Sequence, residues 1–209
     1  MFNLGGAAVT EELVEGYKFS RCSYVLSLLR KSVINELFPK RFFEKIVLFK
    51  RDPHSFTPTL DGRYLLFGSN AKKNEQEIAK FSTKDAENYQ KFENFLKNMV
   101  QIIKPFIDQK PITGVLNISW KHIQHIFKIL EHLINNGNNL IPFYHFLTSS
   151  AASYLDYYFE SEVLKSTLAT DAVIGAMKSP KSLGSAYVLL HHVMGEIDEQ
   201  GSWFYVQVK

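Results

Sequence analysis

Cysteine is nearly absent from this sequence. Cys22 is the single cysteine among 209 residues, so it has no partner with which to close an intrachain disulfide. A reducing compartment therefore fits the chain better than secretion does. Cys22 lies in an apolar run, and we predict a buried, unreactive thiol at this position rather than a reactive one.

Long hydrophobic runs are also missing. No apolar stretch approaches the roughly 20 residues that cross a bilayer, and the N-terminus lacks the basic and apolar regions of a signal peptide. The formal net charge is only +3, with 22% charged residues, and the basic residues are scattered. These features argue against a transmembrane segment and against a nucleic-acid partner.

The common catalytic and phosphate-binding motifs do not occur. The sequence has no Gly-x-Ser-x-Gly, no P-loop and no Gly-x-Gly-x-x-Gly. His122 and His125 are three residues apart on an expected helix, and His132 follows, but Glu131 is the nearest acid. Because metal sites usually need three or four ligands with supporting carboxylates, we predict no metal site there.

Two other groups of polar residues have the right chemistry for a site. His191 and His192 are adjacent, so on a helix they point about 100° apart and cannot bind one ion together. We expect one to face a core or cavity and the other solvent; a role at a ligand cavity is the alternative to a structural one.

Asp156, Glu160 and Glu162 flank a predicted helix junction, where capping and solvation account for them. Local chemistry therefore identifies no catalytic residue.

The first third of the chain has the patterns of short strands. Loose alternation predicts extended structure after a turn at Glu15-Gly16, and residues 45–49 form a branched and aromatic run typical of a buried strand. Between these segments, Ser32 is the expected cap of a short helix that ends near Pro39.

Residues 56–68 give the clearest local prediction, a hairpin. Asp61-Gly62 readily adopts the positive φ angles of a tight turn. Pro58 lacks an N–H, so the first strand should lie at an edge or be irregular.

After Gly68 the apolar spacing changes to three and four residues, which predicts helices. Ser82 and Asp85 have the spacing of a capping box, and Pro105 should kink or end the long helix that follows. The buried stripe expected on that helix consists of Tyr89, Phe92, Leu96, Met99, Ile103 and Phe106.

Serine caps and glycine or proline breaks mark the remaining elements. We expect a short helix over 75–81, a helix from Ser119 to Asn136-Gly137, a linker over 138–142, helices beginning at Ser149 and Ser161, a last helix over 185–194, and a strand over 203–208 after a turn at Gln200-Gly201. With strands early, helices afterwards and a strand at the C-terminus, the predicted fold class is α+β, in which helices cover part of a sheet.

Gly5 and Gly6 form the most suggestive short motif. Neither residue has a Cβ, so the backbone can lie very close to a flat or charged group. Placed before Ala-Ala-Val-Thr and a strand, the doublet is typical of backbone packed against a ligand, and an ordinary loop is the alternative. The doublet alone does not decide between the two.

Longer blocks of sequence carry more information. The two most specific cover residues 164–177 and 187–195, and shorter ones cover residues 4–12, 17–30, 51–58 and 159–162. Together they resemble flavoproteins of the phytoene dehydrogenase-like (carotenoid/retinoid oxidoreductase) family. The resemblance extends over most of the chain and is thinnest between residues 111 and 147.

The resemblance implies an FAD-dependent oxidoreductase with two domains, an apolar small-molecule substrate and a location in the mitochondrial matrix. It implies that Gly5 and Gly6 approach FAD, that residues 1–16 belong to the FAD-binding domain, and that residues 17–209 belong to the substrate domain. In such enzymes the isoalloxazine ring carries the redox chemistry, which accounts for the lack of an acid–base pair.

The sequence also departs from the family pattern. Family members have a strand and a Gly-x-Gly-x-x-Gly turn before the doublet and a long segment after a stretch like Tyr205-Val206-Gln207. Many also have an acidic residue and a glycine near the positions of Ser20 and Cys22; this chain has neither, so we predict no flavin contact there. We therefore expect a fragment of a two-domain FAD-dependent oxidoreductase, incomplete at both ends and a poor binder of FAD by itself.

Two alternatives remain open. One is a non-enzymatic interaction module, derived from such an enzyme, that binds a protein partner. The other is a lipid-surface protein, which only the 14% aromatic content suggests.

Overall fold

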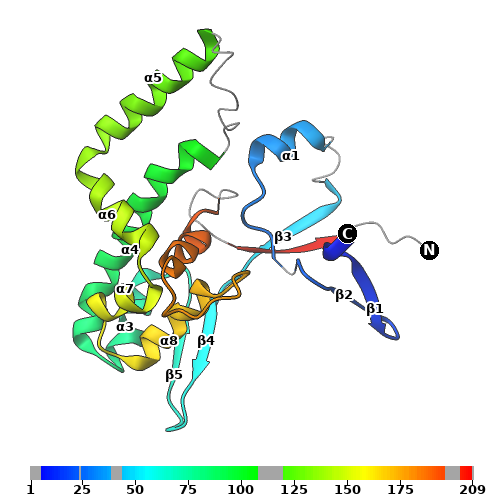
Figure 1. Ribbon diagram of the computed structural model, residues 1–209. Helices are drawn as coiled ribbons and strands as arrows, with labels where there is room; N and C mark the ends of the chain where they lie inside the picture. The colour runs from blue at the N-terminus through cyan, green and yellow to red at the C-terminus, as the bar shows by residue number, and fades with distance from the viewer. Residues whose placement is uncertain (1–5, 24, 39–43, 108–119, 196–202, 209) are drawn as a thin grey trace. The chain divides into compact units, whose positions relative to one another are not determined.

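The computed structural model describes residues 6–23, 25–38, 44–107, 120–195 and 203–208. The chain divides into unit 1, which combines Met1–Asp52 with Gly195–Lys209, and unit 2, Pro53–Met194. Figure 1 shows short strands in the early part of the chain, helices in the middle and a strand near the C-terminus. The predicted α+β class is confirmed.

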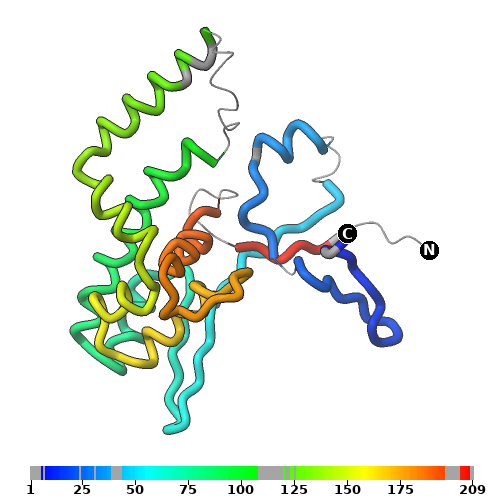
Figure 2. The backbone as a smooth tube through the Cα atoms, viewed as in Figure 1, coloured from blue at the N-terminus to red at the C-terminus, as the bar shows by residue number. Residues whose placement is uncertain are grey.

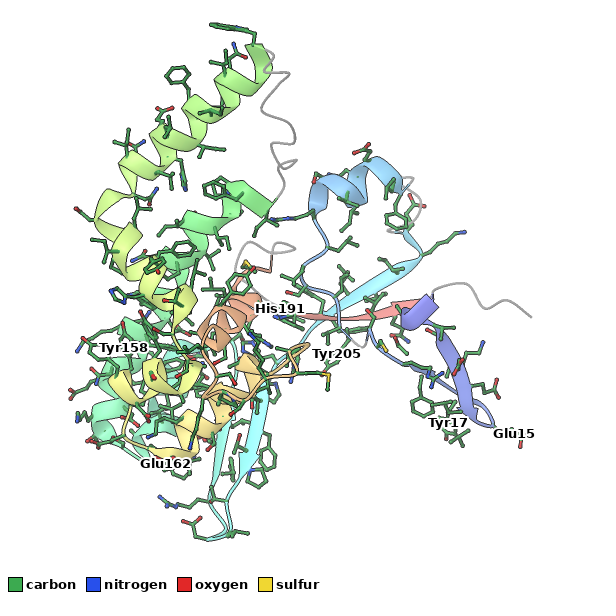
Figure 3. The ribbon with its side chains drawn as sticks, in the orientation of Figure 1. Glu15, Tyr17, Tyr158, Glu162, His191 and Tyr205 are labelled. Atoms are coloured by element: carbon green, nitrogen blue, oxygen red, sulfur yellow. The ribbon has the colours of Figure 1, made fainter. Side chains whose placement is uncertain are left out.

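Unit 1 begins with a short 3-10 turn and a hairpin. The turn η1 (Gly6–Ala8) leads into strand β1 (Thr10–Val14), which pairs antiparallel with β2 (Tyr17–Ser20). Gly16 adopts a φ of 82° at the tip, and its N–H donates to the Glu12 carboxylate at 2.7 Å. The predicted extended structure after Glu15-Gly16 is confirmed, and Glu15 and Tyr17 lie at the tip of this hairpin (Figure 3).

The second sheet of unit 1 joins segments that are far apart in sequence. Strand β3 (Ile46–Lys50) pairs antiparallel with β6 (Phe204–Val208), and Leu26 forms an isolated bridge with Phe204. Figure 2 shows the C-terminal strand β6 running beside the segment that forms β3. The expected strand over 203–208 is confirmed. The strand predicted over 45–49 is confirmed as β3, but it is only half-buried to exposed, so its predicted burial is wrong. The turn expected at Gln200-Gly201 lies outside the described residues.

Two further predictions in unit 1 need correction. Helix α1 (Lys31–Leu37) starts after Arg30, which makes no side-chain capping bond, so Ser32 is not its cap. Cys22 is exposed rather than buried; it lies in the bend that follows β2.

Unit 2 starts with the predicted hairpin. Strand β4 (Ser55–Pro58) pairs antiparallel with β5 (Tyr64–Phe67), and Gly62 has a φ of 83° in the connection. The Asp61 carboxylate accepts from the Arg63 side chain and the Thr59 hydroxyl, and these hydrogen bonds lower its pKa. The first strand ends at Pro58, so Thr59 and Leu60 belong to the turn.

Helices α3 (Ala71–Ala79) and α4 (Thr83–Ile107) follow. The short helix predicted over 75–81 is therefore longer, because the Asn70 side chain caps it by accepting from Lys73 N at 3.1 Å. The stripe of α4 buries Phe92, Leu96 and Met99, whereas Phe106 is exposed. Pro105 lies in the last turn, close to the end of the helix as predicted.

The middle helices include the largest error of the sequence prediction. Helix α5 (Trp120–Asn135) stops before Asn136-Gly137 as expected, but α6 (Gly137–Thr148) begins at once and occupies the predicted linker 138–142. Leu140, Phe143 and Phe146 of α6 pack in or against the core, and this burial outweighs the low helix propensity of its asparagine, glycine and proline residues. Ser119, the expected cap of α5, lies outside the described residues.

The last elements of unit 2 are short. Ser150, rather than Ser149, caps α7 (Ala151–Tyr158), and Ser161 caps α8 (Glu162–Ala169) as predicted. The 3-10 segments η2 (Thr170–Ala172) and η3 (Ser185–Val193) complete the unit, so the last apolar helix is 3-10 rather than α.

An aromatic cluster forms the core where α4, α6 and α7 meet. Phe146 is fully buried, and its ring contacts those of Phe95 and Tyr154 edge to face at centroid distances of 5.4 and 5.0 Å. Phe92 makes similar contacts with Tyr158 and Phe159. Such pairs contribute beyond their buried area, so this cluster adds to the stability that the buried aliphatic residues give unit 2.

Candidate functional site

The glycine doublet is described only in part. Gly5 lies outside the described residues, and Gly6 begins η1 with a φ of 55°. A Cβ at Gly6 would meet nothing within 4 Å. Glycine therefore suits this position because of its backbone conformation, and the space beside it is open to an approaching group.

The histidine pair lies in η3 of unit 2. The ring centroids of His191 and His192 are 5.4 Å apart at an interplanar angle of 71°, so the two rings do not lie in one plane. His192 Nε2 is 3.3 Å from Asp171 Oδ1 of η2. Both histidines are partly buried, so the expectation that one of them faces solvent is wrong.

Tyr89 of α4 adds a further ionisable group near this pair. Its hydroxyl is buried, and burial, together with the negative charges of Glu93 and Asp171, raises the pKa of Tyr89. Asp171 of η2 therefore interacts both with His192 of η3 and with Tyr89 of α4. The sequence analysis identified only the histidines of this group. Asp171 is too far from His192 along the chain for a local motif to connect them.

His191 should make the stability of unit 2 depend on pH. Burial lowers the pKa of His191, so the unfolded chain binds a proton more readily than the folded one. Stability is fully present above the ordinary histidine pKa of about 6.5 and is lost as the pH falls below it towards the folded value. We expect His191→Gln to flatten this loss.

Urea unfolding of the wild type and His191→Gln between about pH 7.5 and 5 measures the difference in slope. His192→Gln is the matched control, because it removes the neighbouring ring that pairs with Asp171. Parallel curves for the wild type and His191→Gln would contradict the prediction.

The other histidines do not form a ligand set among the described side chains. His132 Nε2 lies 3.2 Å from the carbonyl oxygen of Ile102, and its ring contacts Phe106. The side chains of His122 and His125 lie outside the described part of the structure. Within the described residues, no group of three or more histidine, cysteine, aspartate or glutamate side chains could hold a metal ion.

The carboxylates near residue 160 bind basic and hydroxyl groups instead of one another. Asp156 and Glu162 both pair with Lys165 Nζ, at 2.7 and 2.6 Å, and these contacts raise the pKa of Lys165. Glu160 accepts from Lys84 Nζ and Ser82 Oγ, which lower its pKa. All three carboxylates are exposed, as the solvation part of the prediction requires, but Ser161 rather than any of them caps α8.

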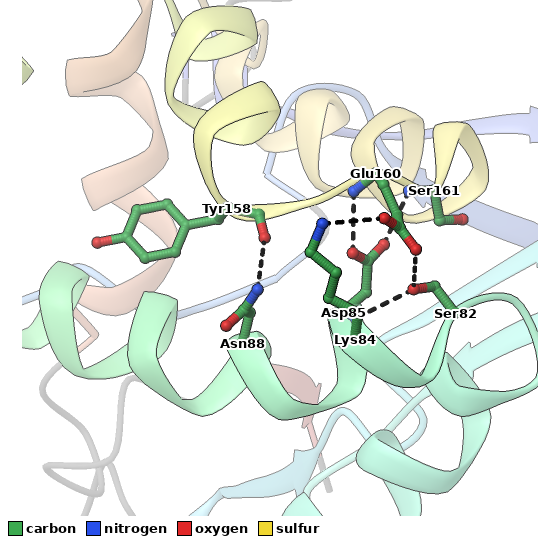
Figure 4. Close-up of polar contacts among 7 residues, drawn as sticks. All are labelled: Ser82, Lys84, Asp85, Asn88, Tyr158, Glu160 and Ser161. Carbon is green, nitrogen blue, oxygen red and sulfur yellow. Dashed lines mark hydrogen bonds and ion pairs between the residues drawn. The ribbon is translucent and has the colours of Figure 1, made fainter.

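Asp85 is the polar residue whose role the sequence did not reveal. Its backbone N–H donates to Ser82 Oγ at 3.1 Å, which confirms the predicted cap of α4. Its buried carboxylate does not complete the capping box; it accepts from Glu160 N at 2.9 Å and Ser161 N at 2.8 Å (Figure 4). Asn88 Nδ2 donates to Tyr158 O in the same junction. This network fixes the α7–α8 connection on α4.

Comparison with known proteins complements this geometry. No protein-family model matches the chain. The mouse protein named "Pyridine nucleotide-disulfide oxidoreductase domain-containing protein 2" is 45% identical over 218 aligned residues, which cover 98% of this chain. This chain is a homologue of that protein. The rat protein of the same name is 44% identical over the same share of the chain.

The match covers only part of the relatives. The chain spans 37% of the length of the mouse and rat proteins. It is therefore related to an oxidoreductase-domain protein over nearly all of its own sequence and over about a third of theirs. No helix among the described residues is both long enough and apolar enough to cross a membrane.

Proposed function

We propose that this chain is part of an FAD-dependent oxidoreductase of the phytoene dehydrogenase-like type. The observation that supports this most is the 45% identity to the mouse oxidoreductase-domain protein over 98% of the chain. The sequence blocks at residues 164–177 and 187–195 support the same family. The substrate class that we propose is an apolar small molecule.

Gly5 and Gly6 are the proposed FAD-facing residues. Gly6 fits this role because its φ is positive and the position beside it is open. The FAD isoalloxazine ring, when bound, supplies the redox chemistry. The chain's own contribution is that its backbone at Gly6 can approach the cofactor closely. In this proposal residues 17–209 belong to the substrate domain.

A segment exchange tests the proposal directly. In the mouse relative, this chain replaces the segment with which it aligns, and the purified chimera and the parent protein are compared by flavin absorbance. We expect both to carry FAD. A parent or chimera that is folded but colourless would overturn the proposed cofactor.

The isolated chain gives a second readout. We expect the 209-residue chain to bind FAD far more weakly than the chimera, because it contains no Gly-x-Gly-x-x-Gly turn to hold the pyrophosphate. Titration with FAD, followed by quenching of flavin fluorescence, measures this. A stoichiometric complex with the isolated chain would contradict the expectation of an incomplete site.

Gly6→Val should release the flavin from the chimera. Valine at a positive φ is strained, and its side chain would enter the space proposed for the cofactor, so we expect FAD binding to weaken roughly tenfold or more. Gly16→Val is the matched control, since Gly16 also has a positive φ and an open Cβ position but lies at the hairpin tip. Equal flavin content in both variants would exclude the role assigned to Gly6.

The proposed location is the mitochondrial matrix, and it rests on the family resemblance alone. Imaging of the tagged protein in cells, together with a matrix marker, tests this location. A signal that does not overlap with the marker would reject this location without affecting the proposed cofactor.

The alternative function is a non-enzymatic interaction module. The observation that favours it is a row of exposed apolar side chains on α5, of which Trp120 and Ile134 are 70% and 76% exposed. Large exposed apolar surfaces usually bind partners. A monodisperse monomer that unfolds cooperatively and retains no protein in pull-down experiments would count against it.

A further inference from the structure

Helix α5 has more apolar surface than its own unit covers. Among its described side chains none is fully buried, although apolar residues occupy half of the helix circumference. Ile126 and Leu133, on one edge of the apolar arc, are partly covered. Phe127 and Leu130, on the other part of the arc, are exposed.

The exposed apolar residues follow a regular spacing on α5, and two more are exposed on α6. We call them the α5–α6 stripe. Within α5 the steps between them are seven, three and four residues, which are typical of helices that pack lengthwise against another helix. The members of the stripe, all exposed, are Trp120, Phe127, Leu130, Ile134, Ile141 and Tyr144.

We propose that the α5–α6 stripe is an interface between two copies of this chain, in which the α5 helices pack antiparallel about a two-fold axis near Leu130. A covered aromatic side chain buries about 150–250 Å², so the stripe offers each copy several hundred Å². This is on the order of the roughly 800 Å² per partner that a standard interface uses.

The charges beside the stripe favour a second copy in the antiparallel orientation. Lys128 and Glu131 are both exposed on the polar edge of the stripe. Antiparallel packing brings this edge against the same edge of the other copy, so Lys128 of each copy lies near Glu131 of the other, twice by symmetry. Parallel packing would instead bring the polar edge of one copy against the apolar edge of the other, at Ile126 and Leu133.

A lipid surface fits the stripe less well. Helices that lie in a membrane interface usually have a strongly basic polar face. Among the described side chains of α5, the exposed lysine and carboxylate charges are one of each sign, Lys128 and Glu131, and α6 has no acidic or basic residue other than His145. These charges match a second copy better than an anionic bilayer.

Sedimentation equilibrium of the 209-residue chain is the first test. We expect a reversible dimer, and we expect Leu130→Glu to weaken its dissociation constant about 100-fold, because two carboxylates would meet at the two-fold axis. Leu60→Glu is the matched control: Leu60 is fully exposed in the β4–β5 turn, so this variant should dimerise normally. Circular dichroism confirms that each variant is folded.

Cross-linking tests the orientation. In a Cys22→Ser background, Leu130→Cys should form a disulfide between copies, because equivalent atoms approach one another near the axis. Trp120→Cys should not, because antiparallel packing separates the two copies of residue 120 by about 30 Å along the helix, far beyond the reach of a disulfide. Cross-linking at residue 120 but not at 130 would reject the antiparallel arrangement.

Three results would overturn the proposal. They are a monomer at all accessible concentrations, a dimer that Leu130→Glu leaves unchanged, and a monomer that binds anionic phospholipid vesicles through α5. A charge exchange adds a positive criterion: Lys128→Glu and Glu131→Lys should each weaken the dimer, and the double variant should restore it.

Discussion

Asp85→Ala is expected to destabilise unit 2 by about 3 kcal/mol. The carboxylate is fully buried and accepts the backbone N–H groups of Glu160 and Ser161. Hydrogen bonds to a charged acceptor are stronger than neutral ones, and their loss leaves two donors unsatisfied beside the core. Unfolding in urea, followed by far-ultraviolet circular dichroism, measures the change.

Asp85→Asn separates the hydrogen bonds from the packing of the side chain. The amide keeps one acceptor oxygen but turns its own N–H groups towards a donor, so a loss of about 2 kcal/mol is expected. Lys84→Met is the control, because the exposed Lys84–Glu160 pair in the same junction should contribute little. Asp85→Ala with wild-type stability would show that the junction does not depend on this carboxylate.

Phe146→Ala should destabilise unit 2 even more, by about 3–5 kcal/mol, which is the usual range for removing a buried phenylalanine. Phe146 is fully buried and contacts the rings of Phe95 and Tyr154. The truncation leaves a cavity between α4, α6 and α7 that these rings cannot close without leaving their rotamers. The same urea experiment measures the effect.

Tyr157→Ala is the matched control for this prediction. It also removes an aromatic ring, but Tyr157 is 80% exposed on α7. A small change is expected. Equal losses for Phe146→Ala and Tyr157→Ala would mean that the aromatic cluster does not form the core of unit 2.

The functional interpretation came from the sequence more than from the geometry. The blocks around residues 164–177 and 187–195 pointed to the oxidoreductase family, and the homology to the mouse and rat proteins agrees with that direction. Gly6 has a positive φ, a backbone conformation that glycine adopts readily and other residues adopt rarely. Its contact with FAD remains a proposal, which the chimera can test.

Several elements were predictable because their causes are local. The turn at Gly62, the caps at Ser82 and Ser161 and the stripe of α4 depend on residues within a few positions of one another. The linker prediction over 138–142 failed for the opposite reason. Its composition disfavours a helix, but the contacts that stabilise α6 come from other elements of unit 2.

By itself, the sequence determined the α+β class, most of the helices and strands, and the family to which the chain is similar, since periodicity, caps and blocks of identity are properties of neighbouring residues. Only the tertiary structure decided that Asp85 binds the backbone 75 and 76 residues away, that β3 pairs with β6, and that Asp171 meets His192. These contacts depend on how the chain returns to itself. No local pattern encodes that path, because each partner is acceptable in many other pairings until packing brings the two together.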